Sequence, residues 1–228
     1  KGDEVISADI VSKEAKNPAL FVIGANGYGK KTALDEYKTQ KRGGVGVVDL
    51  ETKEEDFVTH LISANTHDDL LFFTNLGKAY QIKMYDIPEG KRATKGKSIM
   101  NFLSLGGDER VTSILAVPKK AKEEKASLMF VTKKGVSKKV AYDSFKDVRR
   151  SGIIAIKLDA GDELDAVLRV QKGQSIILAT AQGQSIRFDE KDIREMGRAA
   201  GGVRAIKLGK SDKVIGADIV AEEEGSFM

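Results

Sequence analysis

The stretch LLFFTNLG, residues 70–77, sets a pattern that recurs along this chain. A short run of aromatic and branched apolar residues leads into a polar segment that ends at Gly77. Such a run, closed by a turn that contains glycine, is typical of the first strand of a β-hairpin. The stretch therefore predicts a strand, a tight turn and a returning strand.

The same pattern occurs four times. In each copy the first apolar residue lies seven positions before the glycine, and the four glycines are Gly27, Gly77, Gly135 and Gly183. Self-similarity at intervals of roughly 50 residues is the signature of a repeat architecture. Each hairpin is thus expected to be the centre of one repeated unit.

Two further elements accompany the hairpins. Segments that begin with aspartate read as strands that open the units, and they occupy residues 3–11, 56–63, 108–117, 162–170 and 212–220. Apolar segments close the units and end at Leu50, Leu103, Leu158 and Leu208. About four strands in about 50 residues are the dimensions of a propeller blade, and one blade needs neighbours to bury its faces.

We therefore predict an all-β fold, a propeller-like array of four-stranded blades in a single domain, residues 1–228. The blades are expected at approximately 3–50, 56–105, 108–158 and 162–208, with the start of a fifth at 212–228. Because the chain begins with Lys1 and stops where a fifth hairpin should begin, we expect it to be a piece of a longer polypeptide.

The composition limits the classes of function. No run approaches the roughly 18 apolar residues of a transmembrane helix. The absence of cysteine excludes disulfides and thiolate metal sites, and the only histidines, His60 and His67, are expected to be ordinary packing or surface residues. With 38 basic and 34 acidic residues the net charge is only +4, so an anion-binding surface would require charges sorted in space.

Arginine recurs at one position of the repeat. It lies fifteen residues after each hairpin glycine, at Arg42, Arg92, Arg150 and Arg198. Equal positions in an array of equivalent units predict a ring or spiral of positive charge. Glycines and small residues beside these arginines would let backbone N–H groups approach phosphate oxygens, which are the main sequence-independent contacts to DNA.

Other cations are expected to face the same DNA backbone. They lie three and four residues after the hairpin glycines or close to the arginines, at Lys30, Lys31, Lys95, Lys97, Lys138, Lys139, Arg149, Arg187 and Arg204. A structural alternative stays open, because the five-donor guanidinium of each arginine could instead tie its loop to a carboxylate or to carbonyls of the next blade.

The sequence offers no catalytic motif. The segment GANGYGKK, residues 24–31, nearly matches a phosphate-binding loop, but Lys31 occupies the required Ser/Thr position and the context reads as a hairpin instead of strand and helix. Neither histidine is placed to serve a nucleophilic serine. We expect this segment to be non-catalytic and to need no cofactor.

The loop around Arg42 carries a family likeness. QKRGGVG, residues 40–46, resembles the gyrase box of the C-terminal domain of the DNA gyrase A subunit, whose usual form is Q-R-R-G-G-[RK]-G. The segments at 54–88, DERVTSIL, DELDAVL and GVRAIKLGKSDKV resemble blades of the same family, so the resemblance covers nearly the whole chain.

The resemblance implies a β-pinwheel whose basic rim wraps duplex DNA and supports ATP-dependent negative supercoiling by the whole enzyme. By position, the box residues are Gln40, Lys41, Arg42, Gly43, Gly44 and Gly46. Val45 stands where a basic residue is usual, and four hairpins are fewer than the six blades usual in the family. Both departures reduce the expected contact with DNA.

The resemblance also implies partners and a location. These are double-stranded DNA, the rest of the gyrase A subunit and the gyrase B subunit, in the bacterial cytoplasm and without a membrane. ATP and magnesium are expected elsewhere in the complex. The topoisomerase IV A subunit is the alternative within the family, and a protein-interaction propeller braced by its arginines is the alternative of another class.

Overall fold

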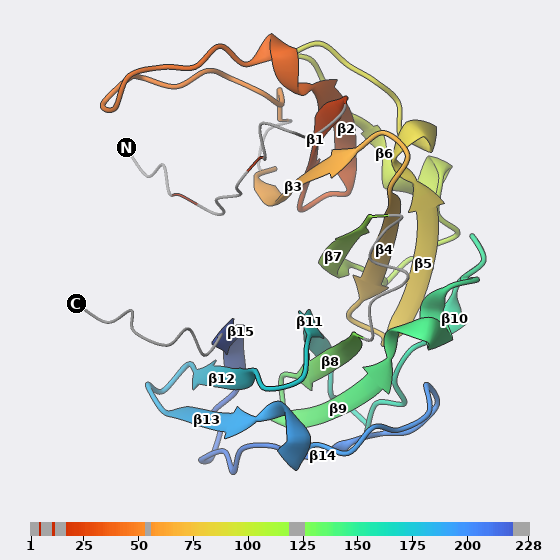
Figure 1. Ribbon diagram of the computed structural model, residues 1–228, viewed down its shortest axis with the longest axis vertical. Coiled ribbons are helices and arrows are strands. Elements are labelled where there is room, and N and C mark those ends of the chain that lie inside the picture. Colours follow the sequence, from red (N-terminus) through yellow and green to blue (C-terminus); the bar gives the residue numbers. More distant parts are fainter. Residues whose placement is uncertain (1–4, 6–10, 12–16, 53–55, 119–125, 221–228) are drawn as a thin grey trace.

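The computed structural model describes residues 5, 11, 17–52, 56–118 and 126–220. These residues form four antiparallel β-sheets arranged along an open arc (Figure 1), with short 3-10 turns between strands. The all-β, propeller-like fold expected from the repeats is confirmed.

Each sheet is built around one of the four hairpins. The first sheet has the order β3 (Val58–Asn65), β1 (Pro18–Gly24), β2 (Tyr28–Ala33) and β6 (Lys97–Ser98). The second runs β10 (Ile153–Ile154), β5 (Lys78–Lys83), β4 (Asp69–Thr74) and β7 (Val111–Val117). The third runs β11 (Leu164–Val170), β8 (Ser127–Thr132), β9 (Val136–Ala141) and β14 (Val203–Arg204). The fourth runs β13 (Ser185–Asp189), β12 (Ser175–Thr180) and β15 (Val214–Val220).

Single 3-10 turns follow the hairpins or the short outer strands. They are η1 (Leu34–Glu36), η2 (Met84–Asp86), η3 (Ile99–Asn101), η5 (Tyr142–Phe145) and η6 (Glu190–Asp192). The four hairpin glycines all have positive φ, between 73° and 84°. Glycine adopts this conformation without steric cost, so the turns form where the sequence predicts them.

The sheets cut across the sequence units. Strand β3 opens the unit at 56–105, yet it pairs with β1 of the preceding hairpin. An aspartate explains this pairing, because the carboxylate of Asp56 accepts the backbone N–H of Asn26 in the preceding hairpin turn at 3.0 Å. Asp162 and Asp212 accept N–H groups of the turns before them in the same way.

The outer strands are exchanged as well. Strands β6, β10 and β14 each close a sequence unit but pair with the hairpin of the unit before it. The segment 212–220, expected to start a fifth unit, supplies β15 to the fourth sheet. The expected strand at 3–11 lies almost entirely outside the described residues. Strand exchange therefore couples each unit to the next.

Aromatic and aliphatic side chains fill the space between adjacent sheets. Phe21 meets Phe72 edge-on between the first and second sheets, and Phe73 meets Phe130 between the second and third, with ring centroids 5.9 and 5.5 Å apart. Met129 and Val131 pack with Ile176 and Leu178 of the fourth sheet. These contacts bury apolar surface that a single sheet would expose to water.

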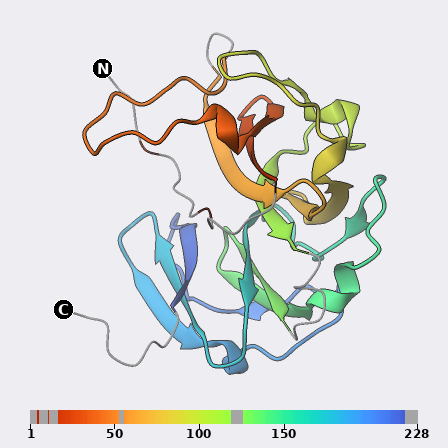
Figure 2. The same cartoon turned by 45° about the horizontal axis from the view of Figure 1, so that its top comes forward.

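The arc has an inner and an outer side. Strands β3, β7, β11 and β15 line its inside, whereas the short strands β6, β10 and β14 lie towards the outside (Figure 1). The loop between β2 and β3 projects from the first sheet (Figure 2). The expected cations can now be located on this frame.

Candidate nucleic-acid interface

The gyrase-box residues lie on the projecting loop between β2 and β3. Residues 38–48 are all exposed, and Gly43 and Gly46 have φ of +83° and +80° with open space around them. A turn forms inside the box, where the N–H of Gly44 donates to the carbonyl of Lys41 at 3.1 Å. The side chains of Lys41 and Arg42 form no hydrogen bond or ion pair with any described residue. Both cations are free to meet an external anion.

The four arginines that lie fifteen residues after the hairpin glycines are called the register arginines. The three besides Arg42 each contact the preceding unit. Arg92 is half-buried with its guanidinium 6.0 Å from the ring centroid of Tyr37. Arg150 pairs with Asp86 at 2.7 Å while its side chain stays 64% exposed. Arg198 donates to a backbone carbonyl at 3.3 Å, that of Ile154. The structural alternative thus holds in part, although the Arg150 side chain still reaches solvent.

Several of the additional cations are exposed near the outer strands. Lys97 and Arg204 lie on β6 and β14, and Arg149 lies just before β10. Lys95 sits 3.7 Å from Glu51, but both side chains are exposed, so their attraction is screened by water. Arg187 lies on β13 and donates to the hydroxyl of Ser175 on the neighbouring strand.

The expectation that the four lysines three and four residues after the hairpin glycines face DNA needs a correction. Lys30, Lys31 and Lys138 are 2%, 8% and 0% exposed, and Lys139 pairs with Glu190 at 2.5 Å in a half-buried position. A buried ammonium cannot reach a phosphate at the surface. These lysines stabilise the interior and do not contact a partner at the surface. The sequence does not reveal this, because strand pairing decides that their side chains point inward.

Two of these lysines hold loops of the following unit. Lys30 donates to the carbonyls of Asp49 and Lys91 at 2.7 and 2.6 Å, and the Asp49 carboxylate lies 3.6 Å from its ammonium. Lys138 donates to carbonyl oxygens alone. These belong to Ala155 at 2.6 Å, Ala200 at 3.0 Å, Gly197 at 3.4 Å and, at shorter range, Arg198. Burial, and then the nearby charge of Arg198, lower the pKa of Lys138 to about 8.

A tyrosine takes the equivalent position in the second unit. Tyr80 is fully buried and its hydroxyl donates to Glu109 at 2.8 Å. Burial first, and then this carboxylate, raise the pKa of the Tyr80 phenol. Its ring supports the loop that carries Arg150, because a Cβ added at Gly152 would lie 2.5 Å from the ring. The sequence places Tyr80 where the first and third units have a lysine, but it carries no sign that this ring lies beneath the next loop.

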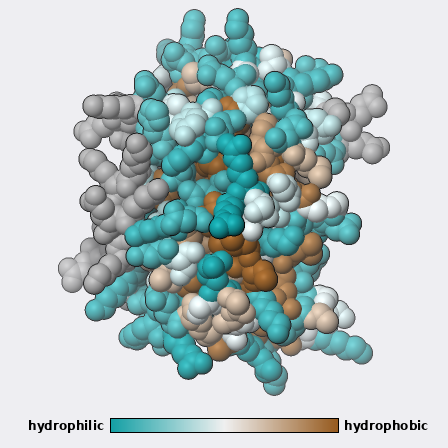
Figure 3. Space-filling view, turned by 90° about the vertical axis from the view of Figure 1, so that its right-hand side faces the viewer, coloured by the Kyte–Doolittle hydropathy of each residue, from teal (hydrophilic) through white to brown (hydrophobic). Residues whose placement is uncertain are grey.

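The outer side of the arc is mostly hydrophilic around a central apolar patch (Figure 3). Strand β10 lies on this side and contributes Ile154, whose side chain is 58% exposed. A polar outer surface with cations on several strands suits a charged partner better than a large hydrophobic one.

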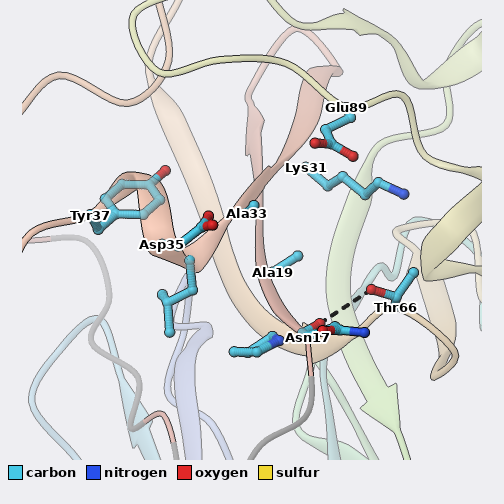
Figure 4. Close-up of a pocket in the computed structure, with 10 residues that line it drawn as sticks. Asn17, Ala19, Lys31, Ala33, Asp35, Tyr37, Thr66 and Glu89 are labelled. Carbon is cyan, nitrogen blue, oxygen red and sulfur yellow. Dashed lines mark hydrogen bonds between the residues drawn. The ribbon is translucent and has the colours of Figure 1, made fainter.

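One pocket lies at the start of β1, beside the base of the projecting loop (Figure 4). It has a volume of about 450 Å³ and is lined by Ala19, Lys31, Tyr37 and Glu89 among others. A hydrogen bond from the Thr66 hydroxyl to the Asn17 carbonyl, 3.2 Å long, crosses its edge. No group of His, Asp and Glu side chains in the described ranges could hold a metal ion. Nor do those ranges contain a helix long and apolar enough to cross a membrane.

Comparison with protein families gives one match that spans the repeats. The model of the DNA gyrase C-terminal domain, a beta-propeller, matches residues 19–65, 68–118, 126–171 and 174–221. Each matched block contains one hairpin and the inner strand that pairs with it. The family blocks therefore follow the observed sheets more closely than the sequence units do.

Curated relatives are DNA gyrase A subunits of bacteria. The chain is 39% identical over 225 residues to that of Buchnera aphidicola subsp. Baizongia pistaciae, covering 99% of this chain and 26% of the relative. It is 44% identical over 187 residues to that of Halalkalibacterium halodurans, covering 82% and 22%. The chain thus spans about a quarter of the length of the curated relatives it matches.

Solved structures show the same architecture. A DNA gyrase A C-terminal domain superposes with a TM-score of 0.73 at 27% identity, covering 90% of this chain and 66% of that one. The C-terminal domain of DNA topoisomerase IV superposes with the same TM-score at 24% identity, covering 92% and 63%, which speaks for the fold alone.

Proposed function

Because this chain belongs to the family of DNA gyrase A C-terminal domains, we propose that it binds duplex DNA and bends it along the outer side of the arc. The observation that carries the proposal is a set of exposed cations without partners among the described residues. These are Lys41, Arg42, Lys97, Arg149 and Arg204. Lysine or arginine left unpaired at the surface is available to neutralise phosphates and release their counterions.

The contacts proposed here are to the DNA backbone. The free cations come from an exposed loop and from the edges of successive sheets, and the described elements include no α-helix that could enter a groove. Binding of this kind tolerates many sequences. Bending a short site by 40–90° costs on the order of 1–6 kcal/mol, which several phosphate contacts can offset.

The gyrase box supplies the most accessible part of this surface. Lys41 and Arg42 project on a loop whose glycines leave the backbone uncovered. Val45, where the family usually has a basic residue, is fully exposed. It offers no charge to a phosphate, so the box is proposed to make fewer contacts than its usual form does.

The role of the whole protein is part of the same proposal. By its family, the domain would wrap DNA for ATP-dependent negative supercoiling, with the rest of the gyrase A subunit and gyrase B as partners in the bacterial cytoplasm. ATP and magnesium would act elsewhere in that complex, and this segment would contribute no catalytic group. The box, which is largely intact apart from Val45, favours gyrase over topoisomerase IV as the parent enzyme.

A second function is favoured by one specific observation. Arg150 pairs with Asp86 of the preceding unit, as expected if the register arginines brace a protein-interaction scaffold. The same arginine is 64% exposed, so the pair does not remove it from solvent. The two functions differ in their response to salt.

The test is a duplex-binding titration at several salt concentrations, with the variant Lys41→Ala/Arg42→Ala. The native chain should bind mixed-sequence duplexes with log K falling linearly against log salt, and the variant should lose about 1.8 units of that slope, roughly 0.9 per phosphate contact. Its thermal midpoint should stay unchanged because both side chains are exposed and neither forms a hydrogen bond or ion pair with a described residue.

The matched control removes two exposed lysines outside the arginine loops and outer strands, in the variant Lys172→Ala/Lys210→Ala. This variant should keep the native affinity and slope. Ligation of relaxed plasmid in the presence of the native chain should also shift the topoisomer distribution to one side. Salt-independent or absent duplex binding would favour the scaffold.

A further inference from the structure

Lys138 is a buried cation whose hydrogen-bond partners are all backbone carbonyls, and its ammonium lies 5.3 Å from the ring centroid of Phe130. Its side chain is 0% exposed, and its ammonium lies among the carbonyl oxygens of Ala155, Gly197, Arg198 and Ala200, which we call the carbonyl cage. Three of these carbonyls belong to the loop at 197–201, which carries the register arginine of the fourth unit. A single side chain therefore fixes the orientation of several peptide groups in that loop.

The orientation has a consequence for the N–H groups. In a trans peptide the C=O and the N–H point in opposite directions, and the described chain contains no cis peptide. Because the carbonyls of Arg198 and Ala200 point inward to Lys138, the N–H groups of Ala199 and Gly201 point away from it. Both residues are exposed, and no described residue accepts a hydrogen bond from either N–H.

No carboxylate among the described residues compensates the positive charge of the Lys138 ammonium. Lys30, the equivalent residue of the first unit, has the Asp49 carboxylate 3.6 Å away. No described carboxylate forms an ion pair with Lys138, and the charged group that influences it is another cation, Arg198. A buried ammonium without a counter-charge is unfavourable, and an anion bound at the loop would supply the missing negative charge.

We propose that Lys138 is a positioning residue that makes the loop 197–201 a phosphate-binding loop. Outward N–H groups of Ala199 and Gly201 form a site for one phosphate group, and the same loop carries Arg198, whose guanidinium donates to the carbonyl of Ile154 at 3.3 Å. Concave arrangements of backbone N–H groups bind anions in this way. The inference rests on the proposed function, because the phosphate is that of a DNA backbone.

The loop of the fourth unit also carries fewer cations than its counterpart in the third unit. The equivalent loop of the third unit, supported by Tyr80, carries two adjacent arginines, Arg149 and Arg150. There the cationic side chains themselves would meet the phosphates. In the fourth unit the neighbours of Arg198 are Gly197 and Ala199, so backbone N–H groups would share in binding the phosphate.

The test follows backbone amide resonances of the isotope-labelled chain during titration with a short mixed-sequence duplex. In the native chain the Ala199 and Gly201 amides should shift. In Lys138→Met those shifts should disappear, affinity should fall a few-fold, and the salt slope should drop by about 0.9. The matched control, Lys30→Met, removes the buried lysine at the equivalent position of the first unit and should leave the Ala199 and Gly201 shifts in place.

The outcomes separate two kinds of failure. If the duplex binds and shifts the box and Arg149 amides while Ala199 and Gly201 stay unmoved, the phosphate-binding loop is refuted and the proposed function stands. Persistence of the two shifts in Lys138→Met refutes the positioning role. If the native chain binds no duplex, the proposed function fails and this inference fails with it.

Discussion

Two junctions between units use the same position in different ways. The residue three after the hairpin glycine is Lys138 in the third unit and Tyr80 in the second, and both are fully buried beneath the arginine loop of the next unit. Lys138 holds its loop by donating to backbone carbonyls. Tyr80 supports its loop with the face of a ring and directs its hydroxyl to Glu109. A shared position in a repeat fixes a place in the fold, but the side chain decides how the neighbouring backbone is held.

The difference extends to the arginines. Arg150 belongs to the loop that covers Tyr80, and a side-chain ion pair with Asp86 holds it. Arg198, above the lysine, contributes its own carbonyl to the cage. One loop is therefore held by side chains and the other through its backbone, and variants at each junction should separate these two modes.

The largest effect is expected from Lys138→Met, measured by chemical denaturation at pH 7. The carbonyls of Ala200 and Gly197 would keep other donors, the N–H groups of Lys157 and Ala200. Those of Ala155 and Arg198 would lose the donor that the structure gives them. Each unsatisfied buried carbonyl costs about 1–3 kcal/mol, so the free energy of unfolding should fall by about 3 kcal/mol. An unchanged midpoint would show that the cage contributes no stability.

A smaller loss is expected from Tyr80→Phe. The ring that supports Gly152 is kept, and only the hydroxyl is removed. Glu109 would lose one donor but retain those from Thr74, Lys78 and the backbone of Gly106. The cost should be about 1 kcal/mol by the same denaturation measurement. A loss as large as that of Lys138→Met would mean that the hydroxyl, and not the ring, holds this junction.

Much of the fold could be predicted from the sequence, because hairpins are local. The apolar runs and their glycines determine turns such as that at Gly135, where φ is +77°. The strand exchange between units was not visible, since it depends on Asp56 and its equivalents reaching back to the preceding turn. Pairing between strands distant in sequence has no local signal of this kind.

The candidate site was predictable only in part, for a related reason. The sequence locates cations but not which way a strand turns them. The box loop has no pairing partner in the described chain, so Lys41 and Arg42 are exposed as expected. Lys138 lies on a strand next to a core of Phe130 and Phe145, and its side chain points beneath a loop that belongs to another unit.

A still smaller effect on stability, but a clear effect on binding, is expected from Arg150→Ala. The pair with Asp86 is largely exposed, and pairs of this kind contribute about 0.2–1 kcal/mol. The thermal midpoint should therefore barely change. Duplex affinity should fall, and the slope of log K against log salt should decrease by roughly 0.9, the value for one phosphate contact. A large fall in the midpoint with unchanged affinity would instead support the scaffold. Asp86→Ala is the matched control, because it removes the same pair but keeps the cation.

A change of pH tests the lysine junction without a mutation, because stability and duplex affinity should change in opposite directions there, whereas the tyrosine junction should contribute to neither trend. The pKa of Lys138 is lowered from 10.5 to about 8, by burial and by the nearby charge of Arg198. Above pH 8 the folded chain loses this proton while the unfolded chain keeps it, so the free energy of unfolding should rise between about pH 8 and 10. Duplex affinity should fall over the same range, because a phosphate at the loop favours the charged lysine. If deprotonation merely loosened the loop, the free energy of unfolding and the duplex affinity would both fall. Lys138→Met should remove both trends, whereas Tyr80→Phe should leave them intact, because burial raises the pKa of the Tyr80 phenol well away from this range.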